Sequence, residues 1–341
     1  MSALHVLSAG PGVTVQDLGR PGWLAFGLSR GGAADPLALA EGSALLGQAA
    51  GCAALEMAGY GGVFSPTHDI TIALTGAPMR VTLDGVRIRW NATHRLRAGQ
   101  RLEVGGTEAG VYGYLHVAGG FATDPVMGSR AAHLSAGIGA PLAAGDILPI
   151  GPAAAARAGL GLAVPARFAG GTVRIVASAQ TGLFPAAERA RFEATEFTRD
   201  LRANRQGVYL AHDGAPFRAE GQLSILSEIV VPGDVQMTGE GTPYVLLPEC
   251  QTMGGYPRIG TVVPDDLPIV AQAPVGARIR FRFVPRETAV ADWRRVRACE
   301  AARLAAGIRP LVRDPAAMPD LLAHQLVGGV TAGDDLDVRE E

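Results

Sequence analysis

The sequence contains no lysine, so all 30 of its basic side chains are arginines. A Walker-type phosphate loop, a Schiff base and a biotin or lipoyl attachment site all require a lysine amine. The chain therefore cannot bind a nucleotide through such a loop. It also cannot carry a biotin or lipoyl group, so we expect no covalently bound cofactor.

Charge is scarce as well. Charged residues make up 18% of the 341 residues, and the formal net charge is −2. A nearly neutral chain whose basic side chains gather in no one stretch provides no field that would attract nucleic acid or an anionic membrane. We therefore expect neither nucleic acid nor a membrane as a partner.

Cysteine occurs only as Cys52, Cys250 and Cys299. An odd number without CxxC spacing indicates a reducing compartment rather than a disulfide framework. No apolar run is long enough to span a membrane, and the first residues lack the features of a secretory signal. Together these features predict a cytoplasmic protein.

Familiar catalytic and metal-binding patterns are also missing. None of the seven histidines has HxxxH or HExxH spacing or lies near a cysteine in a ligand pattern, so we expect no metal site. His116 lies in an alternating strand, which is more typical of a structural residue. No GxSxG elbow accompanies the serines. Cys250 lacks an identifiable base, so a nucleophilic role is only a minor alternative.

Glycine and proline are abundant, at 46 and 23 residues, and 48% of the chain is hydrophobic. Between the glycines and prolines lie short apolar runs with β-branched residues and alternation, which indicate antiparallel sheets or barrels. The clearest runs are residues 70–76, 79–85, 101–106, 111–120, 172–178, 244–249 and 277–284. The sequence therefore predicts a mainly β protein.

Two helices are expected. The first spans residues 35–47, with Asp35 at the N-cap and Gly47 at the end. The second spans residues 287–306. Their predicted apolar faces consist of Leu37, Ala40, Ala44 and Leu45 in the first helix, and of Val290, Trp293, Val296 and Leu304 in the second.

Residues 151–171 are rich in alanine, glycine and proline and show little periodicity, as expected where one folding unit gives way to another. We therefore predict an N-terminal unit over 1–165, a C-terminal unit over 166–285, and a helical and irregular extension over 286–341. Within this extension, residues 320–335 have the composition of an apolar docking segment or of a surface strand or helix.

The motif QDLGRPGW, residues 16–23, combines an amide, a carboxylate and a guanidinium before a Pro-Gly turn. Asp17 and Arg20 either pair across the turn and hold the loop closed, or Arg20 presents its planar fork to a ligand. Residues 127–133, MGSRAAH, contain backbone donors around Gly128 that are typical of an anion-binding nest, although the pattern is short.

A second polar segment lies between two predicted strands, at residues 250–268. Gly254 and Gly255 permit positive φ angles and a close approach to a ligand, while Gln251, Thr252 and Tyr256 supply directional donors and acceptors. We expect this connection either to turn the chain or to bind an amide. Farther along it, Asp266 is expected to act as a cap first and as a ligand second.

Several motifs, in this order, resemble the biotin-dependent carboxyltransferase family. They are VTVQDLGRPGW, GGAADPLALAEGSALLGQ, ALEMAG, YLHVAGG, MGSR, VVPGDVQM and PYVLLPECQTMGGYPRIGTVVPDDLPIVAQAPVGARIRF. The family includes the C subunit of 5-oxoprolinase, the proteins labelled allophanate hydrolase subunit 2, and the carboxyltransferase domain of urea carboxylase. The resemblance implies two cyclophilin-like β-barrel units with a few helices.

The resemblance also implies partners. A member of this length usually works with a Kip-inhibitor-type B subunit and, in the 5-oxoprolinase system, with a LamB/YcsF-type A subunit. Together they couple ATP hydrolysis, through another subunit, to opening of the 5-oxoproline ring, which yields glutamate. One alternative is a carboxyltransferase that moves CO2 from carboxybiotin on another chain to a urea-like amide. The other is a non-enzymatic regulatory partner of the Kip-antagonist type.

A small amide or lactam substrate needs paired donors and acceptors, together with N–H groups or an arginine at the oxygen that becomes charged. The catalytic candidates are Asp17, Arg20, Glu249 and Gln251. The substrate-binding candidates are Gln16, Arg205, Gln236, Thr252, Gly254, Gly255 and Tyr256. In this assignment Gln251 and Thr252 bind the carbonyl, Arg20 or Arg205 binds a carboxylate, and Asp17 or Glu249 orients a group or relays a proton.

Overall fold

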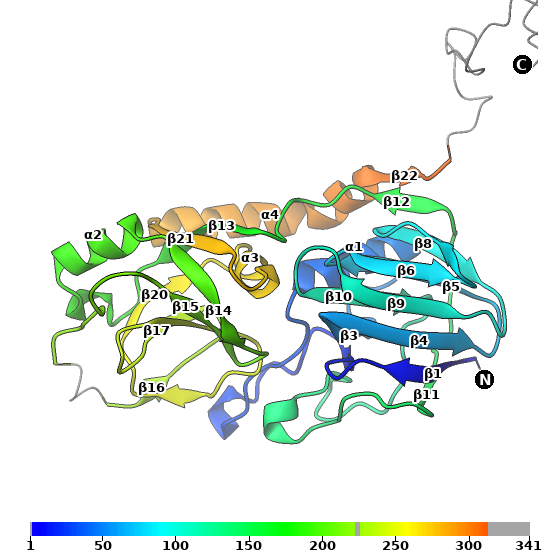
Figure 1. Ribbon diagram of the computed structural model, residues 1–341, viewed down its shortest axis with the longest axis horizontal. Coiled ribbons are helices and arrows are strands. Elements are labelled where there is room, and N and C mark those ends of the chain that lie inside the picture. The colour runs from blue at the N-terminus through cyan, green and yellow to red at the C-terminus, as the bar shows by residue number, and fades with distance from the viewer. Residues whose placement is uncertain (1, 222–225, 313–341) are drawn as a thin grey trace, which may run out of the picture.

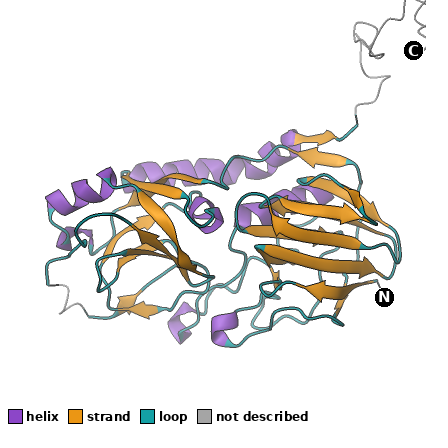
Figure 2. Ribbon diagram, in the orientation of Figure 1, coloured by secondary structure: helices purple, strands orange, loops and turns teal. Residues whose placement is uncertain are grey.

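A computed structural model describes residues 2–221 and 226–312 of the chain. Within these ranges the protein is mainly β, with four α-helices, which confirms the predicted fold class (Figure 2). No helix in this part of the chain is both long and apolar enough to cross a membrane. The predicted docking segment at 320–335 lies outside the described residues.

The first unit, formed by β1 to β12 and joined by β22, contains two sheets (Figure 1). In spatial order, one consists of β11 (Ile147–Pro149), β1 (Ala3–Ala9), β4 (Tyr60–Pro66), β9 (Leu102–Thr107), β6 (Met79–Leu83) and β7 (Val86–Arg87). The other consists of β2 (Thr14–Gln16), β3 (Ala54–Ala58), β10 (Tyr112–Val117), β5 (Ile70–Gly76), β8 (Ala92–Leu96), β12 (Leu160–Leu162) and β22 (Ile308–Pro310). Apolar side chains of both sheets form one core cluster.

Helix α1 (Pro36–Leu46) covers the second sheet of this unit, over β5 and β10. It begins at the predicted N-cap, where the Asp35 carboxylate accepts a hydrogen bond from the backbone N–H of Ala38, and it ends at Gly47. Because α1 packs on one side and the core on the other, every residue of β5 is buried. This two-sided burial explains the continuous apolar run at 70–76.

The buried face of α1 differs from the predicted one. Leu37, Ala40 and Ala44 are only half-buried, whereas Glu41 and Gly42 are fully covered. Glu41 tolerates burial because both of its carboxylate oxygens accept hydrogen bonds from Arg167, at 2.9 and 2.7 Å. The apolar pattern of the helix does not reveal such a buried glutamate, since the arginine that pairs with it is far away in the sequence.

The second unit is a closed barrel in the order β13, β20, β17, β18, β15, β14, β21. These strands are β13 (Gly170–Val176), β20 (Arg258–Val262), β17 (Asp234–Met237), β18 (Pro243–Leu246), β15 (Gly207–Ala211), β14 (Phe197–Ala203) and β21 (Arg278–Phe283). A parallel pair, β13 with β21, completes the barrel. Helix α2 (Ala186–Ala194) contributes Phe192, whose ring lies 5.0 Å from that of Phe197 and 5.1 Å from that of Phe281.

The two units are joined by buried polar contacts. Gln272, the last residue of α3 (Leu267–Gln272), accepts hydrogen bonds from the backbone N–H groups of Val111 and Tyr112 and donates to the Asp35 carboxylate. The same carboxylate accepts from Arg167 at 2.7 Å. Asp35 is thus both a helix cap and part of the contact between the units.

The sequence did not predict α2 or α3 as helices, and the role assigned to Asp266 is wrong. Asp266 occupies the N-cap position of α3, but its side chain caps nothing there. Its carboxylate instead accepts from the backbone N–H and the guanidinium of Arg174, at 2.8 to 2.9 Å. A charged guanidinium from β13 outcompetes the free N–H groups of a short helix for the same oxygens.

Helix α4 (Arg286–Gly307) matches the helix predicted at 287–306 and runs along the molecule from the barrel to the first unit (Figure 1). Its predicted apolar face is wrong in part, since Val290 and Trp293 are 40% and 41% exposed. The buried residues are Ala289 and Leu304, near the two ends of the helix. The helix therefore contacts the protein core mainly near its ends.

Candidate functional site

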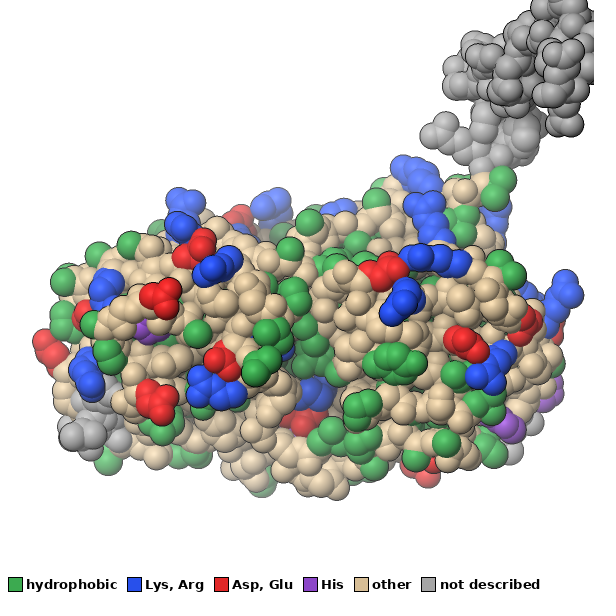
Figure 3. All heavy atoms as spheres, in the orientation of Figure 1, with side chains coloured by type: hydrophobic (Ala, Val, Ile, Leu, Met, Phe, Trp, Pro, Cys, Tyr) green, Lys and Arg blue, Asp and Glu red, His purple; other side chains and the backbone are tan. Residues whose placement is uncertain are grey.

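Loops of the first unit meet the barrel at the lower edge of the molecule in Figure 1. One loop follows β2 and contains η1 (Leu24–Phe26), and another follows β10 and contains η2 (Leu134–Ala136). The backbone N–H of Gly31 donates to the carbonyl of Pro248 at 3.0 Å, which ties the first loop to the barrel. Figure 3 shows acidic and basic side chains in the furrow between the two units.

Asp17 joins two of the sequence motifs. One of its carboxylate oxygens accepts from the backbone N–H of Gly19 at 2.8 Å and from the Ser129 hydroxyl at 2.6 Å. The other accepts from the backbone N–H of Arg130 at 2.7 Å. The predicted anion nest at MGSR is therefore filled by a carboxylate of the chain itself, and Asp17 forms no direct ion pair with Arg20 within the described ranges.

Arg20 is 1% exposed and holds the same loop from the other side. Its Nη2 donates to the carbonyl of Ala131, and its Nε lies 3.4 Å from the carbonyl oxygen of Val126. Its Nη1 is buried and has no hydrogen-bond partner among the described residues. Burial lowers the pKa of Arg20, while the nearby carboxylates of Asp17 and Glu249 act in the opposite direction.

Arg205 is buried between two carboxylates. Its Nε donates to Glu249 at 2.5 Å, its Nη1 binds Glu56, and its Nη2 donates to the carbonyl of Gly32 at 2.5 Å. Burial works against the charge of Arg205, but Glu56 and Glu249 outweigh it and hold the pKa above the ordinary arginine value. All three guanidinium nitrogens are engaged, so Arg205 joins the two units here.

Glu56 in β3 was not among the residues that the sequence pointed to. Its second oxygen accepts from the Tyr114 hydroxyl at 2.6 Å and from the backbone N–H of Ala34 at 2.8 Å. Burial, followed by the charge of Glu56, raises the pKa of Tyr114 well above its usual value. The available signal was a glutamate in the middle of the apolar strand ALEMA, since a buried carboxylate requires a partner.

The sequence did not point to Ser29 or His133 as site residues. His133 ends the segment MGSRAAH, but only the backbone donors around Gly128 were predicted to act there. His133 lies next to η2, and its Nε2 is 2.8 Å from the Ser29 hydroxyl. Its Nδ1 is 4.0 Å from a carboxylate oxygen of Glu249. Burial lowers the pKa of His133, the charge of Glu249 raises it, and Arg20 and Arg205 add to the lowering.

The predicted amide-binding segment lies on the barrel side. Gln251 donates to the side-chain oxygen of Gln236 at 3.0 Å, and the amide nitrogen of Gln236 is buried without a partner among the residues that the structure describes. A Cβ atom on Gly254 would lie 2.5 Å from that nitrogen. Neither Gly254 nor Gly255 has a positive φ angle, so the glycine pair does not serve the predicted turn geometry. Gly254 instead makes room for Gln236.

The remaining candidates are distributed around these groups. The backbone oxygen of Thr252 accepts from Val230, which helps hold the ribbon formed by β16 (Glu228–Ile229) and β19 (Met253–Gly254). Tyr256 is exposed. Gln16 is fully buried and donates to Thr14 and to the carbonyl of Ala132, and its side-chain oxygen has no partner in the described ranges.

Cys250 is not suited to nucleophilic chemistry. Its side chain is buried with Val230 and Leu246. Burial, together with the charge of Asp234, raises the pKa of its thiol to about 12. Because the thiolate is the nucleophilic form, the minor alternative of a cysteine nucleophile is not supported.

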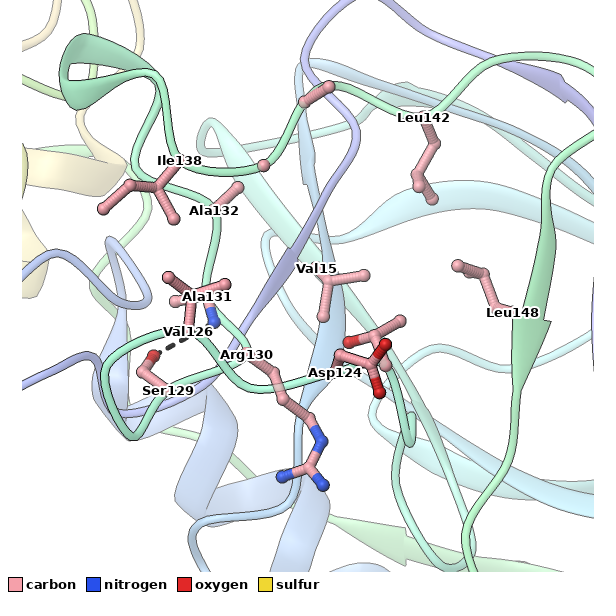
Figure 4. Close-up of a pocket in the computed structure, with 13 residues that line it drawn as sticks. Val15, Asp124, Val126, Ser129, Arg130, Ala131, Ala132, Ile138, Leu142 and Leu148 are labelled. Atoms are coloured by element: carbon pink, nitrogen blue, oxygen red, sulfur yellow. Dashed lines mark hydrogen bonds between the residues drawn. The ribbon is translucent and has the colours of Figure 1, made fainter.

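A cavity of about 200 Å³ lies behind the MGSR loop (Figure 4). In Figure 4 the Ser129 hydroxyl accepts the backbone N–H of Ala131 at 3.0 Å, which keeps the loop turned along the cavity wall. The lining residues are Val15, Thr123, Asp124, Val126, Ser129, Arg130, Ala131, Ala132, Ile138, Gly139, Ala140, Leu142 and Leu148. None of the predicted site residues is among them.

The sequence of this chain is similar to a protein family and to several named proteins. The family model described as carboxyltransferase domain, subdomain A and B, matches residues 26–283. A protein of Haemophilus influenzae named as the C subunit of 5-oxoprolinase is 32% identical, over 84% of this chain and 93% of that protein. A protein of the same name from Escherichia coli is 34% identical, over 82% of this chain and 90% of that protein. A putative urea carboxylase of Emericella nidulans is 32% identical over 44% of this chain and 13% of its own length.

Solved structures are similar as well. The crystal structure of TTHA0988 superimposes with a TM-score of 0.76 at 32% identity and covers 83% of this chain. The chain spans about half the length of that protein, 56%. The K. lactis urea amidolyase superimposes with a TM-score of 0.80 over 92% of this chain and 21% of its own. At 20% identity, this second similarity concerns the fold alone.

Proposed function

Because the chain belongs to the family described as carboxyltransferase domain, subdomain A and B, we propose that it is a subunit of an ATP-dependent complex that opens the ring of 5-oxoproline to give glutamate. Two relatives at 32% and 34% identity are named as the C subunit of 5-oxoprolinase. The similarity covers 93% and 90% of those relatives, so it concerns nearly their whole length.

The observation that carries the proposal is a set of buried polar atoms that lack partners within residues 2–221 and 226–312: Nη1 of Arg20, the side-chain oxygen of Gln16 and the amide nitrogen of Gln236. An unsatisfied buried polar group costs about 1–3 kcal/mol, and a ligand that binds it removes this cost. A lactam acid offers matching groups, namely a carboxylate or carbonyl for the two donors and a ring N–H for the acceptor.

The segments that carry these groups are linked through the loop at 131–132 and through Glu249. Gln16 and Arg20 both hold the loop at 131–132, through its carbonyl oxygens. Glu249 is close enough to Arg20 for its charge to raise the pKa of that guanidinium. Glu249 is also two residues from Gln251, whose side-chain amide donates to Gln236. In the proposed complex Nη1 of Arg20 binds the ring carbonyl oxygen, and Gln236 with Gln251 binds the ring amide beside it. Asp17 keeps the Arg20 loop in place rather than relaying a proton.

ATP is assigned to another member of the proposed complex, since this chain has no lysine with which to complete a phosphate loop. The proposed partners are a Kip-inhibitor-type B subunit and a LamB/YcsF-type A subunit. Large apolar side chains are exposed on η1 and on or beside the β16–β19 ribbon, which supports contact with another protein. They are Phe26 on η1 together with Leu226, Ile229, Met253 and Tyr256 on or beside the β16–β19 ribbon.

The test is reconstitution with these two partner subunits and an assay of glutamate release from 5-oxoproline with and without ATP. We expect ATP-dependent release that falls at least about tenfold in Arg20→Ala and in Gln251→Ala, because each change removes one directional contact with the substrate. Arg95→Ala, which alters an exposed ion pair with Asp69, is the control and should retain full activity. Unchanged turnover in both site variants would remove Arg20 and Gln251 from the site.

A carboxyltransferase subunit is the second candidate, favoured by the similarity to the putative urea carboxylase over 44% of this chain. Biotin would then be carried on another chain. An assay with urea and a biotin carrier whose carboxyl group is isotopically labelled separates the two functions. Only a carboxyltransferase would move the labelled carboxyl group from biotin to the urea nitrogen. A non-enzymatic regulatory module of the Kip-antagonist type would show neither activity.

A further inference from the structure

Three buried side chains from separate segments line up where the two units meet. Ser29, His133 and Glu249 are 3%, 2% and 3% exposed. The Ser29 hydroxyl oxygen lies 2.8 Å from Nε2 of His133, and Nδ1 of His133 lies 4.0 Å from a carboxylate oxygen of Glu249. A hydroxyl, an imidazole and a carboxylate in this order are the groups of an acyl-transfer triad.

The hydrogen bonds determine which imidazole nitrogen carries the proton. The Ser135 hydroxyl is 3.2 Å from Nδ1 of His133 and donates to the backbone carbonyl of Glu249 at 3.1 Å. Since its only hydrogen goes to that carbonyl, Ser135 can only accept from Nδ1. Nδ1 is therefore protonated, and Nε2 is the free base that accepts the Ser29 proton.

The carboxylate of Glu249 is held in place. It accepts from the backbone N–H of Ser135 at 3.1 Å and from Arg205 at 2.5 Å. Fixed at 4.0 Å from Nδ1, it stabilises the imidazolium that forms when Nε2 takes a proton. Because the third member of this arrangement comes from the barrel, the triad exists only when the two units are in contact.

A donor for a developing oxyanion lies beside the pair. A Cβ atom on Gly31 would lie 3.0 Å from Cδ2 of His133 and 3.3 Å from Nη1 of Arg20, so both groups face the same backbone position. Nη1 of Arg20 is buried and has no hydrogen-bond partner in the part of the chain that the structure describes. A free, buried guanidinium N–H next to a nucleophile is suited to stabilise an oxyanion.

We propose that Ser29 is a nucleophile for acyl transfer, with His133 as its base, Ser135 as the group that orients the imidazole, Glu249 as the charge that stabilises the imidazolium, and Arg20 as the oxyanion donor. The substrate class is a carbonyl compound with an amide or ester bond. The choice of 5-oxoproline as the natural substrate rests on the proposed function, whereas the nucleophile itself does not.

Acyl transfer through Ser29 would take place in two steps, acylation of the serine and hydrolysis of the ester. Ser29 Oγ attacks the carbonyl carbon and its proton moves to Nε2 of His133. The C–N bond breaks, and the leaving nitrogen takes that proton, which leaves an ester on Ser29. Water then attacks the ester carbon and gives a proton to Nε2, and the C–O bond to Ser29 breaks as this proton returns to Oγ. Neither step itself uses ATP, which in the proposed complex is hydrolysed by another subunit.

Two short helices lie next to Ser29 and His133 in the sequence. Ser29 follows η1 by three residues, and His133 directly precedes η2. Neither 3-10 helix has a buried residue. Figure 1 shows them as the two short helices, one blue and one green, at the lower edge between the units. Because the core does not hold them, they can part to admit a substrate carbonyl to the buried hydroxyl.

The test uses the full chain and p-nitrophenyl acetate, followed by peptide mapping of the acetyl group. We expect a burst of p-nitrophenolate and one acetyl group at Ser29. His133→Gln should slow acetylation of this position by roughly 100-fold, the range of general base catalysis. Absence of label from Ser29 in the wild-type chain, or equal labelling in His133→Gln, overturns the proposal.

Two controls separate chemistry from folding. Ser8→Ala removes an exposed hydroxyl far from the cluster in the sequence and should label Ser29 at the wild-type rate. Ser135→Ala keeps the imidazole but removes the acceptor of its Nδ1 proton, so its labelling rate should fall less than that of His133→Gln. A rate for Ser135→Ala below that of His133→Gln contradicts the assigned roles.

The two proposals fail separately. Acetylation of Ser29 without ATP-dependent glutamate release by the reconstituted complex supports the nucleophile and contradicts the substrate. Glutamate release that persists in Ser29→Ala supports the proposed function and removes Ser29 from it. The rate of acetylation should also rise with pH through a pKa below the ordinary histidine value, since burial, Arg20 and Arg205 together outweigh Glu249.

Discussion

At the scale of single residues, glycines and buried polar groups show the strongest constraints. Gly42 lies in the middle of α1, where alanine is normally preferred by about 1 kcal/mol. A Cβ atom there would lie 2.2 to 2.3 Å from the ring atoms of His116. His116 itself is buried and hydrogen-bonded to Thr75, so its ring has little room to move.

We therefore predict that Gly42→Ala destabilises the protein. Overpacking of a core costs about 1–3 kcal/mol, which exceeds the gain in helix propensity. Ala40→Gly in the same helix measures the difference in helix propensity between alanine and glycine, since Ala40 is only half-buried and its packing changes less. Urea unfolding followed by circular dichroism measures both. A higher unfolding midpoint for Gly42→Ala than for the wild type would contradict the packing argument.

At the scale of elements, sequence patterns located the strands well and the helix faces poorly. The run at 70–76 coincides with β5, and those at 79–85 and 277–284 contain β6 and β21. Alternation and β-branching act locally, so they can be read from a few neighbours. The faces of α1 and α4 depend on what each helix contacts, and those contacts come from distant segments.

Helix α4 offers a direct contrast. Leu304 is buried with Leu45 and Leu46 of α1, whereas Trp293 is 41% exposed. Leu304→Ala should cost about 2–5 kcal/mol through the cavity that it leaves. Trp293→Ala should change stability by only about 0.5 kcal/mol, although it removes the larger side chain. Equal losses in urea unfolding would show that the middle of α4 is packed as well.

At the scale of the whole molecule, charged residues join the two units. Arg205 of the barrel lies between Glu56 of the first unit and Glu249 of the second. Asp35, Glu41 and Arg167 form another buried ionic group at the same junction. Removing one member of such a group leaves a buried charge without compensation, which costs more than the pair contributes.

Arg205→Met should therefore destabilise the protein by about 3–5 kcal/mol, and Arg95→Met, in an exposed pair, by at most about 1 kcal/mol. Equal losses for the two variants in urea unfolding would contradict this account.

The sequence by itself determined the mainly β class, the strands, the caps of α1 and the absence of lysine chemistry, because these depend on composition or on neighbours within a few residues. Only the tertiary structure decided which residues meet at the furrow. Asp17 binds Ser129 across 112 residues, His133 binds Ser29 across 104, and Arg205 reaches Glu56 across 149. No local pattern encodes such pairs, since each depends on how segments far apart in the sequence pack against one another.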